Sequence, residues 1–192
     1  MTTIRTVEPA ERERATGIQT LAFAADPVIR WLWPDADRYI RHFPELVDAF
    51  GGRAFDHGMA HVTAEFRGGA LWLPPGVGPN EEGLDSIARE RVDESIRSDL
   101  LVIFEQMAES VPAEPHWHLA FIGVDPIWIG NGLGAALLDH ALERIDAEGG
   151  LAYLESTNPR NLTLYQRHGF EVVREIRVGS APTMFPMRRP AR

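Results

Sequence analysis

The sequence predicts a single α+β domain in which helices flank a mixed, mostly antiparallel sheet of six to seven strands. A length of 192 residues fits one compact domain, and a hydrophobic fraction of 44% is enough to fill its core. Segments with strand-like and helix-like apolar spacing are interspersed along the chain, with only one or two β-α-β steps. We therefore expect residues 1–192 to fold as one domain with a mixed sheet.

The first quarter of the chain predicts one strand and two helices. A short strand is expected at residues 3–7, and Pro9 then opens a helix because proline suits the first helical position. The Asp-Pro pair at 26–27 ends this helix. Residues 28–34 predict a loop or short helix between prolines, and a second long helix follows at 35–50, where two glycines interrupt it.

The rest of the chain alternates strands and helices. Apolar spacing and turn residues predict a hairpin, then one long or two consecutive helices, then three further strand regions separated by helices. The predicted hairpin strands are 61–66 and 70–73, the helical region is 84–107, and later elements are a strand at 116–124, a helix at 133–147, a strand at 151–155, a short helix at 159–168 and an antiparallel pair at 171–178 and 184–188.

Composition excludes several classes of protein. The chain has no cysteine, which removes disulfides, cysteine-ligated zinc, iron–sulfur centres and any thioester formed on the enzyme. A net charge of −9 argues against nucleic acid as the main partner. No run of 18 apolar residues and no apolar leader occurs, so we expect a cytoplasmic protein without a membrane partner.

Charge is distributed unevenly. Residues 81–109 carry nine acidic residues against three arginines, and residues 156–192 carry seven arginines against two glutamates. Two solvated faces are the simpler interpretation. The alternative is an anionic ligand near the C-terminal third and a cationic ligand near the acidic segment.

A glycine-rich loop at the start of the helix at 133–147 is the strongest chemical signal. Glycines let backbone amides approach a ligand, and the positive end of the helix dipole favours an anion, so the loop predicts a pyrophosphate cradle. A tight turn needed only for packing is the alternative. The loop residues are Ile129, Gly130, Asn131, Gly132, Leu133, Gly134 and Ala135.

A dinucleotide site is a weaker interpretation of the same loop. Gly130, Gly132 and Ala135 match its glycine pattern, and Glu155 lies at about the distance of a ribose-binding acid. However, five residues separate Val124 from the first glycine, and too few residues follow the loop to supply the remaining strands.

The segment resembles the GNAT superfamily of N-acetyltransferases. That family has a strand ending in valine, a proline soon after, and glycines spaced as Gly130, Gly132 and Gly134 are here. Ile129 departs from the pattern, because the family usually has Gln or Arg there. The family holds pyrophosphate largely through backbone amides, so the departure weakens a side-chain contact more than it removes the site.

A second motif supports the resemblance about 30 residues later. An asparagine, a short helix, a tyrosine and a Gly-Phe pair follow in the family's order at Asn158, Asn161, Tyr165 and residues 169–170. The resemblance is clear over residues 114–192 and is closest in appearance to puromycin N-acetyltransferase-like members. It implies that residues 1–192 form one GNAT-like acetyltransferase domain.

The resemblance also implies a cosubstrate and roles for individual residues. Acetyl-coenzyme A would be the donor and a primary amine the acceptor, with direct transfer between them. The backbone of Ile122, Gly123 and Val124 would hold the pantetheine arm, and Tyr165 would give a proton to the leaving thiolate. Asn158 and Asn161 would contact the cofactor arm or cap the short helix.

The general base stays open between three candidates. His118 shares strand parity with Ile122 and Val124, so it is expected to face the thioester unless a bulge intervenes. Glu155 ends the neighbouring strand, and a water chain is the third candidate. His57 and His61 lack a third ligand, so no metal is expected.

Trp31, Trp33 and Trp72 are expected to pack in the core. The alternative is that they line the acceptor pocket. The leading function is therefore transfer of an acetyl group to a small amine, with aromatic and nucleoside-like amines as candidates. A protein or peptide acetyltransferase and a non-catalytic acyl-coenzyme A-binding module are the alternatives. The chain is expected to be a monomer or homodimer.

Overall fold

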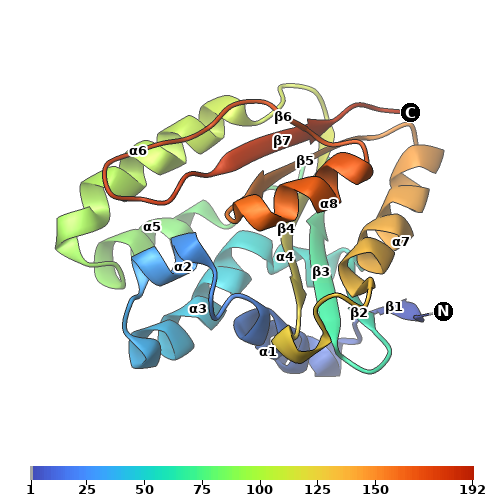
Figure 1. Ribbon diagram of the computed structural model, residues 1–192, viewed down its shortest axis with the longest axis horizontal. Coiled ribbons are helices and arrows are strands. Elements are labelled where there is room, and N and C mark those ends of the chain that lie inside the picture. The colour runs from blue at the N-terminus through green and yellow to red at the C-terminus, as the bar shows by residue number, and fades with distance from the viewer. Residues whose placement is uncertain (1) are drawn as a thin grey trace.

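The computed structural model describes residues 2–192 and contains one seven-stranded sheet with helices on both faces (Figure 1). The sheet runs in the order β1-β2-β3-β4-β5-β7-β6. The strands are β1 (Ile4–Thr6), β2 (Ala60–Thr63), β3 (Gly68–Leu73), β4 (His116–Val124), β5 (Leu151–Ser156), β6 (Glu171–Val172) and β7 (Phe185–Arg189).

Helices supply the two outer layers. Over residues 2–192 they are α1 (Arg12–Ala22), α2 (Pro27–Leu32), α3 (Ala36–Gly51), α4 (Arg53–Asp56), α5 (Glu81–Glu90), α6 (Glu94–Ser110), α7 (Leu133–Ala147) and α8 (Leu162–Arg167). Three short 3-10 turns lie at Pro9–Glu11, Pro126–Trp128 and Pro159–Asn161. The single α+β domain with a mostly antiparallel sheet is as the sequence predicts.

The two faces of the sheet carry separate apolar cores. One core joins α1, α3 and α5 to the sheet and includes Phe43, Val47 and Phe121. The other lies under α7 and α8 and includes Leu137 and Tyr165. Each helix is amphipathic and buries one stripe against its own face of the sheet, so the sheet separates the two cores.

One pair of strands is parallel and all the others are antiparallel. Strand β4 pairs in parallel with β5, but only over four residue pairs, from His116–Leu151 to Leu119–Leu154. Beyond Leu119, no residue of β4 pairs with β5, and residues 121–124 pair only with β3. The middle of the sheet therefore opens between β4 and β5 toward the ends of both strands.

A β-bulge in β4 lies at the point where the two strands separate. Phe121 pairs with Leu71 and Leu119 pairs with Trp72, so Ala120 has no partner in β3. A bulge bends the strand and increases its twist, which turns the second half of β4 away from β5. It also reverses which residues face each core, because side chains alternate along a strand.

Two glycines let helices pack closely on β4 near this bulge. A Cβ on Gly123 would lie 2.5 Å from Ala22 Cβ on α1, and a Cβ on Gly51 would lie 2.9 Å from the Phe121 ring. Neither position has room for a larger residue unless the helix shifts. The lack of a side chain at Gly123 thus lets α1 pack closely on β4. From the sequence, we expected this glycine to allow a bulge or the close approach of a ligand.

Several predicted elements differ in their boundaries. The first helix is a 3-10 turn followed by α1, and Asp26 begins α2 in addition to following the end of α1. The helical region predicted at 84–107 is two helices, α5 and α6. Residues 171–178 form only the two-residue strand β6 and one isolated bridge, from Ile176 to Met184. The short helix α4 was not predicted.

Buried His61 gives the stability of this fold a pH dependence. Its side chain lies in β2 against the His140 ring, with centroids 4.7 Å apart. Burial and the nearby His140 and Arg144 lower the pKa of His61 from 6.5 to about 4. Between these values the unfolded chain binds the proton and the folded chain does not, so acid favours unfolding.

We predict that the free energy of unfolding falls by about 2 kcal/mol between pH 7 and pH 5 because of His61. The variant His61→Phe removes this dependence, and His57→Phe, at an exposed histidine, keeps it. Urea titrations at the two pH values measure the difference. An equal loss of stability in His61→Phe and the parent chain would contradict the assignment.

Candidate functional site

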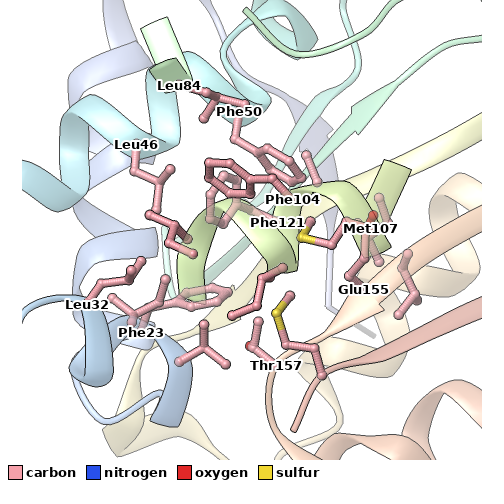
Figure 2. Close-up of a pocket in the computed structure, with 18 of the residues that line it drawn as sticks. Phe23, Leu32, Leu46, Phe50, Leu84, Phe104, Met107, Phe121, Glu155 and Thr157 are labelled. Carbon is pink, nitrogen blue, oxygen red and sulfur yellow. The ribbon is translucent and has the colours of Figure 1, made fainter. Parts of the chain in front are cut away.

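The gap between β4 and β5 opens into a cavity of about 120 Å³ (Figure 2). The gap itself contributes Leu119, Ala120 and Ile122 from β4 and Leu154 and Glu155 from β5. A cavity of this size exceeds by several-fold the volume that one water needs. The bulged strand therefore brings unpaired backbone and a carboxylate to the wall of one cavity.

A second cavity, of about 510 Å³, lies beside the first. Glu155 lines both cavities, together with Phe50, Leu84, Phe104 and Met107. His116 and His118 line only the second cavity. The carboxylate of Glu155 thus lies where the two spaces meet.

His118 and Glu155 form a buried pair. The Glu155 carboxylate accepts a hydrogen bond from His118 Nε2 at 2.7 Å, and the two side chains are only 9% and 5% exposed. The His118 ring also packs edge-on against Phe50, with centroids 5.4 Å apart. Both candidate bases from the sequence therefore belong to one hydrogen-bonded unit.

The parity argument for His118 is wrong. The bulge at Ala120 puts His118 on the face of the sheet that carries Phe50 and Phe121, whereas Ile122 packs on the α7 face. His118 contacts the site only by its hydrogen bond to Glu155. Strand β5, which carries Glu155, is held between β4 and β7. Strand alternation alone did not indicate this route.

Tyr165 lies on α8 and lines the first cavity. Its side chain is 5% exposed, and its ring packs against Phe170 with centroids 6.1 Å apart. Burial, with a smaller contribution from the charge of Asp26, raises the pKa of Tyr165 above its usual value. The hydroxyl is therefore protonated at neutral pH and can donate a proton.

Asp26 joins α2 to the end of β5. Its Oδ1 accepts hydrogen bonds from the amides of Val28 and Ile29 at 3.0 and 3.1 Å, and its Oδ2 accepts one from the Thr157 hydroxyl at 2.6 Å. Burial raises the pKa of Asp26 although these bonds lower it. The sequence predicted Asp26 only as the end of a helix. Its bond to Thr157 follows from its buried position, which the sequence did not indicate.

The glycine-rich loop leaves the first amides of α7 without a side-chain cap. Gly132 is the N-cap residue with φ 76°, a left-handed conformation that favours glycine. No side chain caps this helix and its first turn holds no acid, whereas Asp93 caps α6 and Asn80 caps α5. The free amides and the helix dipole suit an anionic group.

The rest of the loop is exposed and held by its own contacts. The Arg67 guanidinium stacks on the Trp128 ring at 3.8 Å, and Asn131 donates a hydrogen bond to the Trp128 carbonyl. Ile129, at the position that departs from the family pattern, is 69% exposed. It makes the outer surface of the loop apolar where a polar side chain was expected.

The two asparagines of the second motif differ. The Asn158 side chain accepts a hydrogen bond from the Arg160 amide at 3.1 Å, so it caps the turn at Pro159–Asn161. The Asn161 side chain caps nothing and lines the first cavity. Asn161 is therefore the asparagine that faces the site.

Aromatic residues line the first cavity, but they are phenylalanines. Trp33 and Trp72 are fully buried, and Trp31 bonds Ser180 through its indole nitrogen; none of the three lines either cavity. The interpretation of these tryptophans as pocket walls is therefore wrong. The phenylalanines that line the first cavity are Phe23, Phe50, Phe104 and Phe121.

Residues 100–170 match the sequence model of the Acetyltransferase (GNAT) family. This segment contains β4, the glycine-rich loop, α7, β5 and α8, and so includes both strands that border the gap. The chain has the GNAT fold, and residues 100–170 carry the family's sequence pattern.

Two curated relatives are acetyltransferases by name. A mycothiol acetyltransferase of Propionibacterium freudenreichii is 37% identical over 81 residues, which are 41% of this chain and 24% of that protein. The match thus spans about a quarter of that relative's length. An uncharacterized N-acetyltransferase of Schizosaccharomyces pombe is 26% identical over 182 residues, covering 85% of this chain and 72% of that protein.

Solved structures share the fold of this chain over nearly its whole length. A Corynebacterium glutamicum structure described as histone acetyltransferase HPA2 and related acetyltransferase has a TM-score of 0.71 at 24% identity, covering 100% of this chain and 98% of that one. Arylalkylamine N-acetyltransferase 2 from Aedes aegypti has a TM-score of 0.66 at 15% identity, covering 98% of each chain.

In residues 2–192, no three His, Cys, Asp or Glu side chains are arranged to hold a metal ion. None of the helices in that range combines the length and apolar character needed to cross a membrane.

Proposed function

We propose that the protein transfers the acetyl group of acetyl-coenzyme A directly to the primary amine of a small molecule. The observation that carries this proposal is the gap between β4 and β5, which exposes Glu155 and Tyr165 to one cavity, together with the uncapped start of α7. The GNAT pattern over residues 100–170 supports the same donor.

The donor fits the residues present. The amides of Gly132, Leu133 and Gly134 at the start of α7 bind the pyrophosphate, and the free backbone of Ile122, Gly123 and Val124 holds the pantetheine arm. The amides of Gly130, Asn131 and Ala135, with the backbone of Ile129, complete the loop around the phosphates. Asn161 contacts the arm from α8, and Asn158 keeps the preceding turn in shape.

Glu155 is the general base of the proposed reaction. It lies at the junction of the cavities, where an ammonium group can bind and lose its proton to the carboxylate. His118 donates its Nε2 hydrogen to the other oxygen of that carboxylate and so orients it. His118 is thus a positioning residue. The proton that Glu155 takes up is released to solvent through the second cavity, which Glu155 also lines.

Tyr165 acts on the opposite side of the reaction. The amine nitrogen forms a bond to the thioester carbonyl carbon, the carbon–sulfur bond breaks, and the hydroxyl of Tyr165 protonates the departing thiolate. The nitrogen loses its second proton to solvent, and Tyr165 takes up a proton from solvent to regain its hydroxyl. Tyr165 lines the cavity, and its raised pKa keeps the hydroxyl protonated at neutral pH, so the proton is present for this step. The absence of cysteine from the chain agrees with direct transfer.

The first cavity favours a small acceptor over a peptide. A peptide acetyltransferase needs a groove for extended backbone, whereas this cavity of about 120 Å³ is lined by side chains of α2, α3, α5 and α6 as well as the sheet. The resemblance to puromycin N-acetyltransferase-like members and a cytoplasmic location remain predictions. An amine panel that includes puromycin-like nucleosides and lysine peptides tests the first of these.

We predict that acetyl-coenzyme A stabilises the protein against heat and that NAD at equal concentration does not. A ligand at 100 times its Kd adds about 2.7 kcal/mol to the unfolding free energy. The variant Gly132→Val should abolish the thermal shift. Gly149→Val is the matched control, because Gly149 also has positive φ and open space but lies beyond the other end of α7.

Thiol release from acetyl-coenzyme A over the amine panel completes this test. Release that depends on an added amine supports the proposed transfer. A thermal shift without release for any amine would leave a binding module, and the absence of both would remove the proposal.

We predict that Tyr165→Phe lowers the single-turnover rate by roughly 10²–10⁴-fold with little change in cofactor affinity. Tyr39→Phe is the matched control, because the Tyr39 hydroxyl bonds the Thr20 carbonyl outside both cavities. It should cost about 0.5–1.5 kcal/mol of stability and leave the rate unchanged. A normal single-turnover rate in Tyr165→Phe would exclude Tyr165 as the proton donor.

A further inference from the structure

The walls of the first cavity differ sharply between its two ends. The end at the gap carries Glu155, Thr157, Asn161 and Tyr165, and the remaining wall residues are all apolar (Figure 2). Only Glu155 and Tyr165 among the lining residues can ionise. The wall on the opposite side from Glu155 includes Phe23, Leu32 and Leu46.

The polar end sets the direction of an acceptor in this space. A reactive amine must lie near Glu155 and the gap, since no other carboxylate lines the cavity. In Figure 2, Glu155 and Met107 lie on one side of the cavity, and Leu32 and Leu46 lie on the opposite side. The body of an acceptor held at Glu155 therefore extends toward Leu32 and Leu46 on α2 and α3.

We propose that the acceptor is a monoamine whose amino group is attached to an apolar alkyl or aryl body that fills this cavity. The inference rests on the proposed acetyl transfer and names its substrate class. Contact between apolar surfaces favours such a body. A second ammonium group in the same space would lose its hydration without a partner, which is strongly unfavourable.

The second cavity offers a competing place for a cationic body. Its acidic lining residues other than Glu155 are Glu81 and Asp85, both exposed on α5. Asp85 is already paired with Arg89 at 2.9 Å. Glu81 is exposed, so water screens its attraction for a bound cation. These acids attract a cation weakly, so the apolar cavity decides the acceptor class.

A matched pair of amines tests the inference without any variant. Hexylamine and hexamethylenediamine have the same chain and differ in the second amino group. We expect kcat/KM for hexylamine to exceed that for hexamethylenediamine by about 100-fold or more, measured as thiol release from acetyl-coenzyme A. Equal or higher kcat/KM for the diamine would overturn the inference and leave the proposed transfer intact.

The other outcomes of the same assay are distinct. Release with lysine peptides or spermidine, but with neither hexylamine nor phenethylamine, would also overturn the acceptor class alone. No release with any amine would remove the proposed function itself. The thermal shift with acetyl-coenzyme A separates this result from an inactive preparation.

A cavity-filling variant locates the apolar body. Leu46→Trp adds volume at the far wall, and it should lower kcat/KM for hexylamine by at least about 10-fold while leaving that for ethylamine nearly unchanged. Ile40→Trp is the matched control on the same helix, because Ile40 is 63% exposed and lines neither cavity. Melting curves check that both variants fold.

The donor's acyl chain is the remaining candidate occupant. If Leu46→Trp suppressed transfer from hexanoyl-coenzyme A but left kcat/KM for hexylamine with acetyl-coenzyme A unchanged, the cavity would hold the acyl chain. That result would overturn the inference. Should Leu46→Trp fail to fold, the matched amine pair still decides the acceptor class.

Discussion

The loss of pairing between β4 and β5 beyond Leu119 is the constraint on which the site depends. Backbone amides and carbonyls inside a sheet normally pair with the next strand, and leaving them unpaired is costly unless another partner takes their place. The bulge at Ala120 turns β4 away from β5 and leaves a row of such groups along one side of the strand. Close packing of α1 on Gly123 holds the bent strand in this position.

The chemistry follows from what this gap brings together. The strand β5 carries Glu155 to the junction of two cavities, and the parallel pairing of His118 with Tyr153 puts His118 on the same face, against that carboxylate. On the other side of the sheet, α8 carries Tyr165, whose buried position keeps its hydroxyl protonated. The proposed base and the proposed acid thus reach one cavity from different elements, so one can take a proton while the other gives one.

The sequence predicted the fold class, the helix at Leu133–Ala147 and the strand at His116–Val124, because these elements have strong apolar periodicity and clear glycine or proline ends. It did not predict the facing of His118, because one bulged residue reverses the alternation and leaves no local signal. It also did not predict that Asp26 bonds Thr157 or that phenylalanines line the cavity. These contacts join segments far apart in the chain, which local patterns do not specify.

Hydrogen exchange of the backbone amides, with and without acetyl-coenzyme A, tests the central claim most directly. The second half of β4, residues 120–124, lacks pairing with β5, whereas residues 116–119 all pair with β5. The account predicts that the cosubstrate slows exchange in 120–124 and in the glycine-rich loop, and that it leaves 116–119 unchanged. Protection confined to residues 76–81 beside the second cavity, with no change in 120–124, would contradict it.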